Sequence, residues 1–529
     1  MTTARPSSLR KDTSGRRPFR RVLVANRGEI AVRIIRACRE LGVETVAVYS
    51  DADRNAVHVR LADEAVRIGP APAIESYLRG DAVVEAARTT GAEAIHPGYG
   101  FLSERASFVR LVEDAGIAFV GPPSDVIAAL GDKLAARRAA DTAGVPVVPG
   151  TLERAPVDRP GDLAEIVAEA TEIGLPLLVK AAAGGGGRGM RRVASLDELP
   201  AALAAGSAEA ASAFGDGAVY LEREVRPARH IEVQLLGDAE GAVVALGERD
   251  CSLQRRHQKL VEESPAPGLT RDERIELHEL AVRAARSAGL RNAATAEFLF
   301  DTERRFWFLE VNTRLQVEHG VTELVSDLDI VREQLWIAAG ESLSERVRAA
   351  AGRAADATRH AIEVRISAED PARDFAPAPG TIGRWELPAG PGIRVDTAAE
   401  SGSHVPPDYD PLIAKLLVVD ESREAAIDRL GRALEETRIS GIQTTLPFHR
   451  FVARDPRFRA GELSIDWVDS HWPEIAAADR RRALGVAVRA AAGAASRARA
   501  SATRATTIAT QGSVWARDGR RRAVERWPR

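Results

Sequence analysis

Alternation of short apolar strands with an amphipathic helix near the amino end constrains the fold of this 529-residue chain most strongly. The segment "RVLVAN" at 21–26 has strand character, Ile30, Ile34, Cys38 and Leu41 then recur at helical spacing, and "ETVAVYSD" again resembles a strand. Strands joined through a helix in this way form a parallel sheet covered by helices. "GAEAIHPGYGFLSE" and "IAFVGPP" continue the pattern, so we expect a doubly wound α/β domain.

Later segments have other patterns and indicate further domains, as the length of the chain also requires. A strand, a glycine-rich loop and a strand follow Lys133, and residues 225–330 contain strands joined by short turns, which is typical of an antiparallel sheet. "RHAIEVRISAED" and "DPLIAKLLVVD" predict a further small sheet. The fold class is therefore α/β and α+β. We expect a tail at 1–18, the doubly wound domain at 19–130, a second domain at 131–340 with a mobile lid at about 148–224, a small β-rich domain at 341–473 and an Ala- and Arg-rich extension at 474–529.

Composition excludes several classes of protein. A formal net charge of −3 argues against a global attraction to nucleic acid or to an anionic membrane. No apolar run reaches the length of a membrane span, and the first twenty residues lack the apolar core of a secretory signal. The only cysteines, Cys38 and Cys251, fit a reducing cytoplasm. The basic extension leaves RNA or an acidic partner as an alternative for that segment alone.

The glycine run in "KAAAGGGGRGM" is not a familiar phosphate loop. A Walker loop places its lysine and a Ser or Thr after the glycines and opens a helix, whereas Lys180 precedes them here and "MRRV" resembles a strand. The context of a dinucleotide fingerprint is missing as well. The run therefore predicts either a flexible linker or a hairpin-like flap whose backbone closes over phosphates. The glycines concerned are Gly184, Gly185, Gly186 and Gly187.

A predicted hairpin in "AEFLFDTERRFWFLEV" brings two carboxylates together. When the segment is folded about Glu303 and Arg304, Glu297 lies opposite Glu310, and opposed side chains of an antiparallel pair point to the same face. Asn312, two residues further on, shares that face. Two carboxylates on a covered sheet repel each other, and a divalent cation removes the conflict. Oxygen ligands of this kind suit Mg²⁺ or Mn²⁺ together with nucleotide phosphates. The alternative is a slipped register, or one of the two glutamates at an exposed edge.

Two dense polar segments lie near this hairpin in the sequence. "ERDCSLQRRHQK" contains Gln254, His257 and Lys259, and "NTRLQVEHGVTE" contains Arg314 and Glu318. Cationic groups beside a carboxylate-bound metal hold anionic substrates and neutralise charge in phosphoryl transfer. A solvated charged face remains the alternative for these segments taken alone.

Taken in order, the motifs "LVANRGEIAVRIIRACRELG", "IHPGYGFLSE", "GDK", "KAAAGGGGRGM", "ERDCSLQRRHQK", "EFLF", "EVNTRLQVEH" and "DPLIAKL" resemble the biotin carboxylase component of biotin-dependent carboxylases, which has an ATP-grasp nucleotide site. The resemblance covers about residues 19–460. It implies that domain 131–340 is the ATP-grasp domain and that 19–130 and 341–473 are the N- and C-terminal biotin carboxylase domains.

The resemblance also implies a reaction in which ATP, bicarbonate and biotin give carboxybiotin, ADP and phosphate through carboxyphosphate. Glu318 would be the base, with Arg314, Arg365 and Lys259 as the other catalytic residues. Nucleotide and bicarbonate would be held by Lys133, Lys180, the glycines of the flap, Glu222, Val225, His230, Gln254, His257, Gln316 and Val317. The metal would be held by Glu297, Glu310 and Asn312.

The resemblance further implies partners. Biotin-accepting domains carry a lysine flanked by methionines, and the two methionines here are Met1 and Met190. We therefore expect biotin on a separate biotin carboxyl carrier protein, a second partner that supplies carboxyltransferase activity, and a homodimer. The final acceptor stays open among acetyl-CoA, propionyl-CoA, longer acyl-CoA, pyruvate and urea, because the carboxyltransferase selects it. The alternatives are an ATP-grasp carboxylate–amine ligase and a truncated or non-catalytic assembly subunit.

Three positions depart from the family pattern. Arg223 stands where relatives commonly have Lys, Gly320 replaces the usual Pro after "VEH", and Ser367 replaces the usual Asn in "RINAED". Because glycine loosens a backbone, we expect Gly320 to change the rate of the reaction rather than abolish it.

Overall fold

The structure is a computed structural model that describes residues 16–153, 155, 162–182, 190–477, 488–489 and 492. The chain divides into two compact units, Met1–Asp469 and Ser470–Arg529, and every element named below lies in the first unit. The predicted flap glycines, Gly184 to Gly187, and most of the extension lie outside the described residues.

The amino-terminal sheet consists of five parallel strands in the order β3-β2-β1-β4-β5. Its strands are β1 (Arg21–Val24), β2 (Glu44–Ser50), β3 (Glu64–Gly69), β4 (Ala94–His96) and β5 (Ala118–Phe119), and its main helices are α1 (Gly28–Glu40), α2 (Val57–Leu61), α3 (Gly80–Thr90), α4 (Ala106–Asp114) and α5 (Ser124–Gly131). The strand order reverses at β1 and β4, where ligands approach such sheets. There the Asn26 amide donates to the carbonyls of Pro97 and Tyr99, both at 2.7 Å. The predicted doubly wound domain is confirmed.

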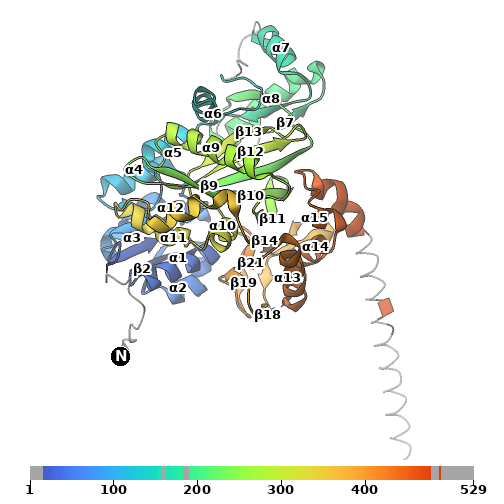
Figure 1. Ribbon diagram of the computed structural model, residues 1–529. Helices are drawn as coiled ribbons and strands as arrows, with labels where there is room; N and C mark the ends of the chain where they lie inside the picture. Colours follow the sequence, from blue (N-terminus) through green and yellow to red (C-terminus); the bar gives the residue numbers. More distant parts are fainter. Residues whose placement is uncertain are drawn as a thin grey trace, which may run out of the picture. The chain divides into compact units, whose positions relative to one another are not determined.

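A second sheet of eight strands, in the order β13-β12-β9-β10-β11-β14-β21-β19, crosses the middle of the first unit (Figure 1). Its strands are β9 (Ala228–Gly237), β10 (Val243–Arg255), β11 (Gln258–Ser264), β12 (Asn292–Asp301), β13 (Phe306–Asn312), β14 (His360–Ser367), β19 (Ile393–Thr397) and β21 (Leu412–Asp420). The helices that follow or accompany these strands are α6 (Lys133–Thr142), α9 (Arg271–Ser287), α10 (His319–Ser326), α11 (Ile330–Ala338) and α12 (Glu345–Ala351).

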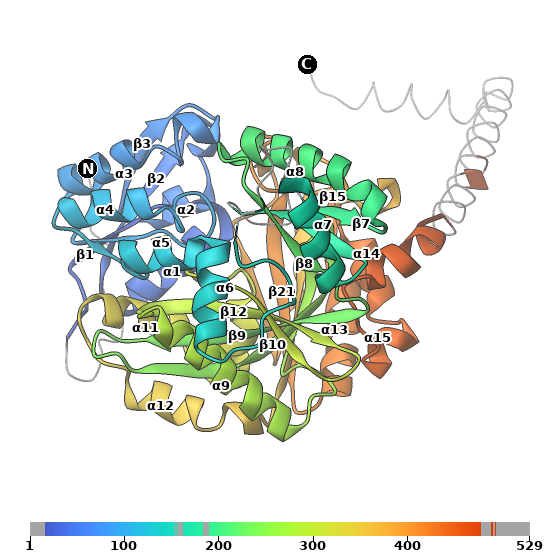
Figure 2. The same ribbon diagram turned by 90° about the horizontal axis from the view of Figure 1, so that it is seen from above.

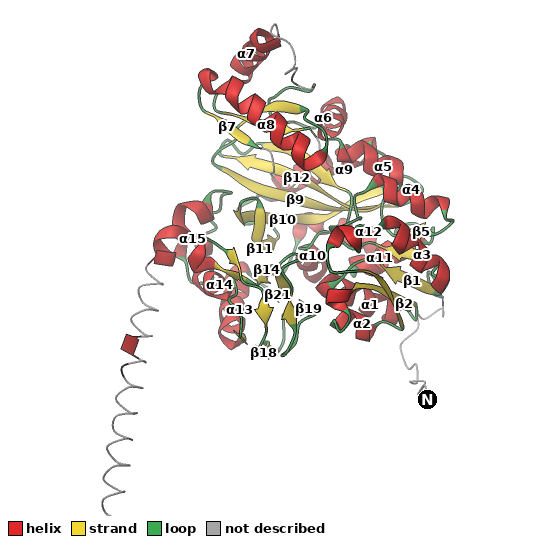
Figure 3. Cartoon of the chain, turned by 180° about the vertical axis from the view of Figure 1, so that it is seen from behind, coloured by secondary structure: helices red, strands yellow, loops and turns green. Residues whose placement is uncertain are grey.

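The carboxyl-terminal strands do not form the separate small sheet that the sequence predicts. Instead β14 pairs with β11 in antiparallel register, with Val261 opposite Val364, and β21 and β19 continue the same sheet (Figure 3). The pairing satisfies the backbone groups along β11, which would otherwise form an open edge. The remaining elements of this region are α13 (Arg423–Glu436), α14 (Leu446–Val452), α15 (Pro456–Ala460) and the two-stranded pairs β15 (Glu369–Asp370) with β16 (Ala376–Pro377), β17 (Gly380–Thr381) with β20 (His404–Val405), and β18 (Arg384–Glu386) with β22 (Arg438–Ser440).

The lid region has a small sheet of its own, in which β6 (Leu177–Ala181) lies between β7 (Arg191–Val193) and β8 (Val219–Arg223). Figure 2 places helices α7 (Asp162–Ile173) and α8 (Leu199–Phe214) beside this sheet. Leu177 pairs with Val193, so strands on both sides of the glycine run are antiparallel neighbours, as the sequence predicts.

Alternation along β9 gives the eight-stranded sheet one apolar and one polar face in its central part. Ile231, Val233 and Leu235 are fully buried in the core that also contains Leu277 and Leu280 of α9. The intervening His230, Glu232 and Gln234 point the other way, because successive side chains of a strand alternate. The same period places Phe298 of β12 in the core and leaves Glu297 on the polar face. The functional site is built on that polar face.

We predict that Phe298→Ala lowers the free energy of unfolding by about 3–5 kcal/mol, because the Phe298 ring is fully buried 5.8 Å from that of Phe308 and its loss leaves a cavity. Urea denaturation followed by fluorescence measures the change. Ile74→Ala, at a site 74% exposed, is the control and should change stability by less than about 0.5 kcal/mol. Equal stability of the two variants would contradict the assignment of this core.

Candidate functional site

One cleft of about 900 Å³ contains the predicted site residues that the structure describes. Its lining comes from the amino-terminal sheet, the lid, the polar face of the large sheet and the loop before α10. The predicted residues that line it are Lys133, Lys180, Glu222, Val225, His230, Gln254, His257, Lys259, Glu297, Glu310, Asn312, Arg314, Gln316, Val317, Glu318 and Arg365. Residues far apart in the sequence thus share one cavity.

The two glutamates are paired as the predicted hairpin requires, although the turn of the hairpin is not at the predicted position. Glu297 is opposite Glu310, but Phe298 is opposite Phe308, so Leu309 is an extra residue in β13. This β-bulge compensates for a turn centred on Glu303 alone rather than between Glu303 and Arg304. The predicted pair is confirmed, and the predicted turn position is wrong by half a residue.

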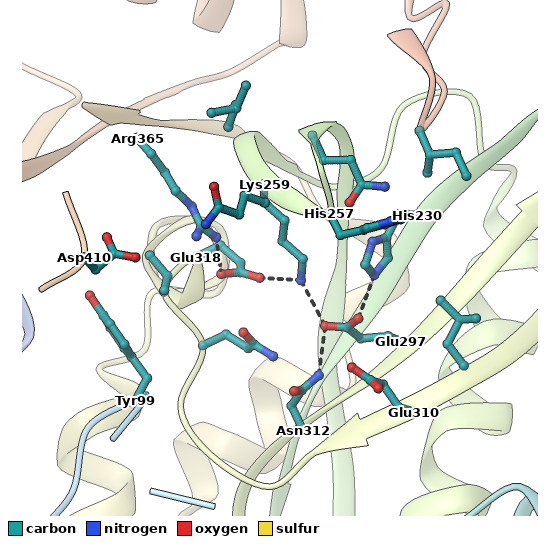
Figure 4. Close-up of a pocket in the computed structure, with 18 of the residues that line it drawn as sticks. Tyr99, His230, His257, Lys259, Glu297, Glu310, Asn312, Glu318, Arg365 and Asp410 are labelled. Atoms are coloured by element: carbon teal, nitrogen blue, oxygen red, sulfur yellow. Dashed lines mark hydrogen bonds and ion pairs between the residues drawn. The ribbon is translucent and has the colours of Figure 1, made fainter. Parts of the chain in front are cut away.

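The ammonium group of Lys259 lies at the centre of the site (Figure 4). Its Nζ donates to Glu318 Oε1 at 2.7 Å, to Glu297 Oε1 at 3.0 Å and to Glu232. All three carboxylates are buried, and Glu232 and Glu318 are fully so. A buried carboxylate is costly unless a charge or hydrogen bonds compensate it, so one lysine holds three acids together.

Electrostatics keep this cluster ionised. Burial acts to lower the pKa of Lys259, but Glu232, Glu297 and Glu318 outweigh it and raise that pKa well above its usual value. Burial acts to raise the pKa of Glu318, but Lys259, Arg365 and Arg249 hold it well below its usual value. The pKa of Glu297 is lowered in the same way by Lys259 and His230. Glu318 is therefore a carboxylate whose basicity its cationic neighbours suppress.

Two arginines flank Glu318. Arg365 donates to Glu318 Oε2 at 2.8 Å and to Glu262 Oε1 at 2.5 Å. Arg314 donates to Gln316 Oε1 at 2.9 Å and to Glu104 Oε2 at 2.8 Å. Carboxylate and amide partners thus hold both guanidinium groups in fixed positions at the cleft. This arrangement preorganises positive charge for an anionic substrate.

The predicted metal ligands present oxygen atoms on one wall of the cleft. Glu297 accepts from Asn312 Nδ2 at 2.9 Å and pairs with His230 Nε2 at 2.9 Å, while Glu310 lies 3.2 Å from Lys133. Two carboxylates from opposed strands with an adjacent amide fit a hard divalent cation. The three residues can hold Mg²⁺ or Mn²⁺ by exchanging these partners for the ion.

Two lysines, Lys180 and Lys133, line the cleft near the lid, and Lys133 also lies beside the predicted metal ligand Glu310. Lys180 of β6 donates to Glu222 Oε1 at 2.8 Å, and Arg137 donates to Glu222 Oε2 at 2.7 Å. Lys133 and Lys180 line the cleft and are suited to bind phosphate groups, whereas Arg137 is fully buried and fixes Glu222. Arg223, which departs from the family pattern, lies with its guanidinium 5.6 Å from the centre of the Trp307 ring.

The β10–β11 turn carries His257 into the cleft on a strained backbone. Arg256 and His257 have φ of +49° and +63°, values that residues other than glycine adopt rarely. A two-residue hairpin turn of type I′ needs positive φ at both central positions. Gln254 and Lys259, on the two sides of this turn, are cross-strand partners. Strain of this kind concentrates at functional sites.

The close packing around position 320 explains why a glycine stands there. It lies buried in the first turn of α10, where a Cβ would be 2.4 Å from Leu417 Cδ2 and 3.3 Å from Glu363 Oε2. The absence of a side chain lets α10 pack closely on β14 and β21. The backbone flexibility that the sequence led us to expect at Gly320 is therefore not needed to explain a glycine at this position.

Sequence reasoning missed several residues that complete the site. Arg249 is fully buried and donates to Glu232 at 2.5 Å and to Thr295 at 3.0 Å, so it holds Glu232 against Lys259. Glu104 fixes Arg314, and Lys415 donates to the Val317 carbonyl at 2.7 Å. The sequence feature that could have identified Lys415 is a charged residue inside an otherwise apolar strand, "PLIAKLLVV".

Within the described part of the chain, none of the helices has the length and hydropathy of a membrane span.

Residues 18–127 match the family "Biotin carboxylase, N-terminal domain", residues 132–346 match "Carbamoyl-phosphate synthase L chain, ATP binding domain", and residues 363–470 match "Biotin carboxylase C-terminal domain".

Individual relatives agree with these matches. The biotin carboxylase of Halalkalibacterium halodurans is 50% identical over 453 residues, which cover 86% of this chain and 98% of that protein. The biotin carboxylase of Allochromatium vinosum is 50% identical over 449 residues, which cover 85% of this chain and 98% of that protein.

Solved structures are similar over the same span. A biotin carboxylase–ATP complex from Campylobacter jejuni has a TM-score of 0.81 at 42% identity, covering 86% of this chain and 99% of that one. The biotin carboxylase domain dimer of the 2-oxoglutarate carboxylase of Hydrogenobacter thermophilus, in complex with MgADP, ADP and bicarbonate, has a TM-score of 0.80 at 46% identity, covering 86% and 98%.

Glu369, on the wall of the cleft, generates a pH prediction. Burial and the nearby Asp410 raise its pKa from 4.5 to about 7, against the opposing effect of Arg255. Between these two pH values the folded protein retains a proton that the unfolded chain releases, so this residue's contribution to stability falls as pH rises from 4.5 to about 7. Glu369→Gln removes the effect, and the variant should gain stability over the parent at pH 8 but not at pH 4.

Thermal unfolding at the two pH values measures the difference. Glu303→Gln, at an exposed position of the β12–β13 turn, is the matched control and should show the parent's pH dependence. The same stability difference between Glu369→Gln and the parent at both pH values would contradict the assignment.

Proposed function

The chain belongs to the biotin carboxylase family, and we propose that it carboxylates biotin on a separate carrier protein, using ATP and bicarbonate. The observation that carries the proposal is the position of Lys259. It pairs with Glu318, the proposed base, and with Glu297, a proposed metal ligand, in the same cleft as the phosphate-binding lysines.

We assign the two ends of the cleft to the two substrates of the first step. The nucleotide occupies the end with Lys133, Lys180 and His257, below the lid. Bicarbonate occupies the region of Lys259, Arg314 and Gln316, where cations and amide groups converge. A bicarbonate oxygen attacks the γ-phosphorus, the bond from that phosphorus to the ADP oxygen breaks, and carboxyphosphate and ADP form. Cations on both sides of the transferred group neutralise its charge.

Glu318 takes the bicarbonate proton in this proposal. A carboxylate of low pKa is a weak base, so its environment must change when substrate binds. Bicarbonate competes with Glu318 for Lys259 and Arg365, which now hold Glu318 at 2.7 and 2.8 Å. Withdrawal of either cation raises the pKa of Glu318 at the moment when a proton acceptor is needed.

Glu297, Glu310 and Asn312 would hold Mg²⁺ or Mn²⁺. When bound, the ion neutralises phosphate charge and polarises the phosphorus–oxygen bonds. Lys133 and Lys180 orient the phosphates beside these ligands.

The second step transfers the carboxyl group. Carboxyphosphate breaks down to CO₂ and phosphate, the phosphate takes the proton of biotin N1′, and N1′ attacks CO₂. Arg365 stabilises the enolate-like ureido oxygen of biotin, because its guanidinium lies at the cleft beside Glu318. The partners are a biotin carboxyl carrier protein and a carboxyltransferase subunit. We also propose that the enzyme is a homodimer and that it is cytoplasmic, since Cys38 and Cys251 are buried and form no disulfide.

Glu318→Gln tests the assigned base. We expect bicarbonate-dependent ATP hydrolysis to fall by about 100-fold or more, because an amide cannot accept the proton. A coupled ADP assay with and without bicarbonate measures the rate, and free biotin should stimulate it in the parent. Glu303→Gln is the control and should keep the parent's rate. Full activity of Glu318→Gln would refute the assignment of the base, and absence of biotin stimulation in the parent would refute the proposed function.

Glu310→Gln tests the metal site. We expect the Mn²⁺ concentration for half-maximal binding in the presence of ADP to rise by about tenfold or more, because one charged ligand becomes neutral. Electron paramagnetic resonance of free Mn²⁺ measures binding directly, without dependence on turnover. If Glu310→Gln and Glu303→Gln bind Mn²⁺ equally, the proposed ligand set is wrong.

A further inference from the structure

Lys415 is a fully buried lysine that lies beneath the cleft rather than in it. It belongs to β21, where the surrounding residues Ala414, Leu416 and Leu417 are apolar and buried. Its Nζ donates to the main-chain carbonyl of Val317 at 2.7 Å. Val317 precedes Glu318, so a buried cation contacts the backbone of the segment that carries the proposed base.

Neighbouring strands hold Lys415 in place. It lies opposite Arg365 of β14 on one side and opposite Asp396 of β19 on the other, so all three side chains share one face of the sheet. Glu363, two residues before Arg365, shares this face and lies opposite Glu262 of β11. Helix α10 covers the same face, with Gly320 packed against Leu417 and Glu363.

The charge of Lys415 is compensated from two directions. Its Nζ lies 3.4 Å from Glu29 of α1 and 3.6 Å from Asp396. Burial acts to lower the pKa of Lys415, but Glu29, Glu363 and Asp396 raise it above its usual value, although Arg394 opposes them. The lysine therefore stays charged and joins the amino-terminal domain, β19 and the loop before α10 at one point.

The loop before α10 is held by two side chains at consecutive carbonyls. His319 Nδ1 lies 2.7 Å from the Gln316 carbonyl, and Lys415 holds the Val317 carbonyl. Burial and the nearby Lys415 lower the pKa of His319 to about 3, so His319 is neutral and its Nδ1 carries the proton donated to Gln316. Glu318 follows directly at the N-cap position of α10, where its carboxylate makes no capping bond and is directed at Lys259 and Arg365.

We propose that Lys415 is a positioning residue, which fixes the Val317 carbonyl and thereby the direction in which Glu318 enters the cleft. The inference rests on the proposed function, in which Glu318 is the base. Without this bond the Val317 peptide can rotate and Glu318 loses its alignment with bicarbonate. A displacement of about 1 Å in a reacting group lowers a rate by about 100-fold. The nucleotide end of the cleft is built from other elements and keeps its geometry.

Lys415→Met tests the proposal, because methionine fills the same volume without a donor or a charge. We expect kcat of bicarbonate-dependent ATP hydrolysis to fall by about 100-fold, with the KM for ATP changed by less than about threefold. Hydrogen exchange of the main-chain amides in residues 316–321 should accelerate by about tenfold or more. If Lys415→Met does not fold, Lys415→Met combined with Glu29→Gln removes one charge of each sign from the buried layer, and the same measurements apply.

Arg423→Met is the matched control. Arg423 is a part-buried cation at the other face of this sheet, where it pairs with Glu263 at 2.7 Å and contacts neither Val317 nor Glu318. It should lower thermal stability but leave kcat and exchange in residues 316–321 unchanged.

Several outcomes would overturn the proposal. These are a kcat within about threefold of the parent, unchanged exchange in residues 316–321, or equal losses of kcat in Lys415→Met and Arg423→Met. If the parent itself shows no bicarbonate-dependent hydrolysis, the proposed function fails, and the exchange measurement still decides whether Lys415 positions the loop.

Discussion

The pairing of one buried ammonium group with three buried carboxylates organises this site. Lys259 lies within hydrogen-bonding distance of Glu232, Glu297 and Glu318, which come from two strands and a loop. In a water-poor interior neither the lysine nor the acids tolerate isolation, so the three segments must meet at this point. Arg249 and Arg365 extend the arrangement on either side, each through a carboxylate that it shares with Lys259. A proposed base and a proposed metal ligand thereby share one cation, and substrate that competes for that cation changes both.

The large sheet makes this arrangement possible. Successive side chains along its central strands point alternately to a face that packs against α9 and to a face that carries charge. The carboxyl-terminal strands extend the charged face past β11. Arg365 and Lys415 therefore lie on the same continuous surface as Lys259, although long stretches of sequence separate them from it. A separate small sheet would not place them there.

The local sequence pattern was sufficient to predict much of the fold and part of the site. It was not sufficient to predict the pairing of strands that are far apart in the sequence. The doubly wound domain follows from strand and helix periods, and the Glu297–Glu310 pair follows from hairpin symmetry, although the bulge at Leu309 was needed to compensate for the turn. The roles assigned to the other site residues came from resemblance. The join of β14 to β11 depends on register between distant strands, which no local period encodes. Lys415, Arg249 and Glu232 were missed because their partners come from segments remote in the sequence.

The central claim is that bicarbonate attacks the γ-phosphate of ATP in this cleft. Hydrolysis of ATP with ¹⁸O-labelled bicarbonate in unlabelled water tests it most directly, with mass spectrometry of the released phosphate as the measurement. Attack by bicarbonate leaves one of its oxygens on phosphorus, so the account predicts one ¹⁸O in each phosphate formed. Phosphate whose new oxygen comes only from water would contradict it.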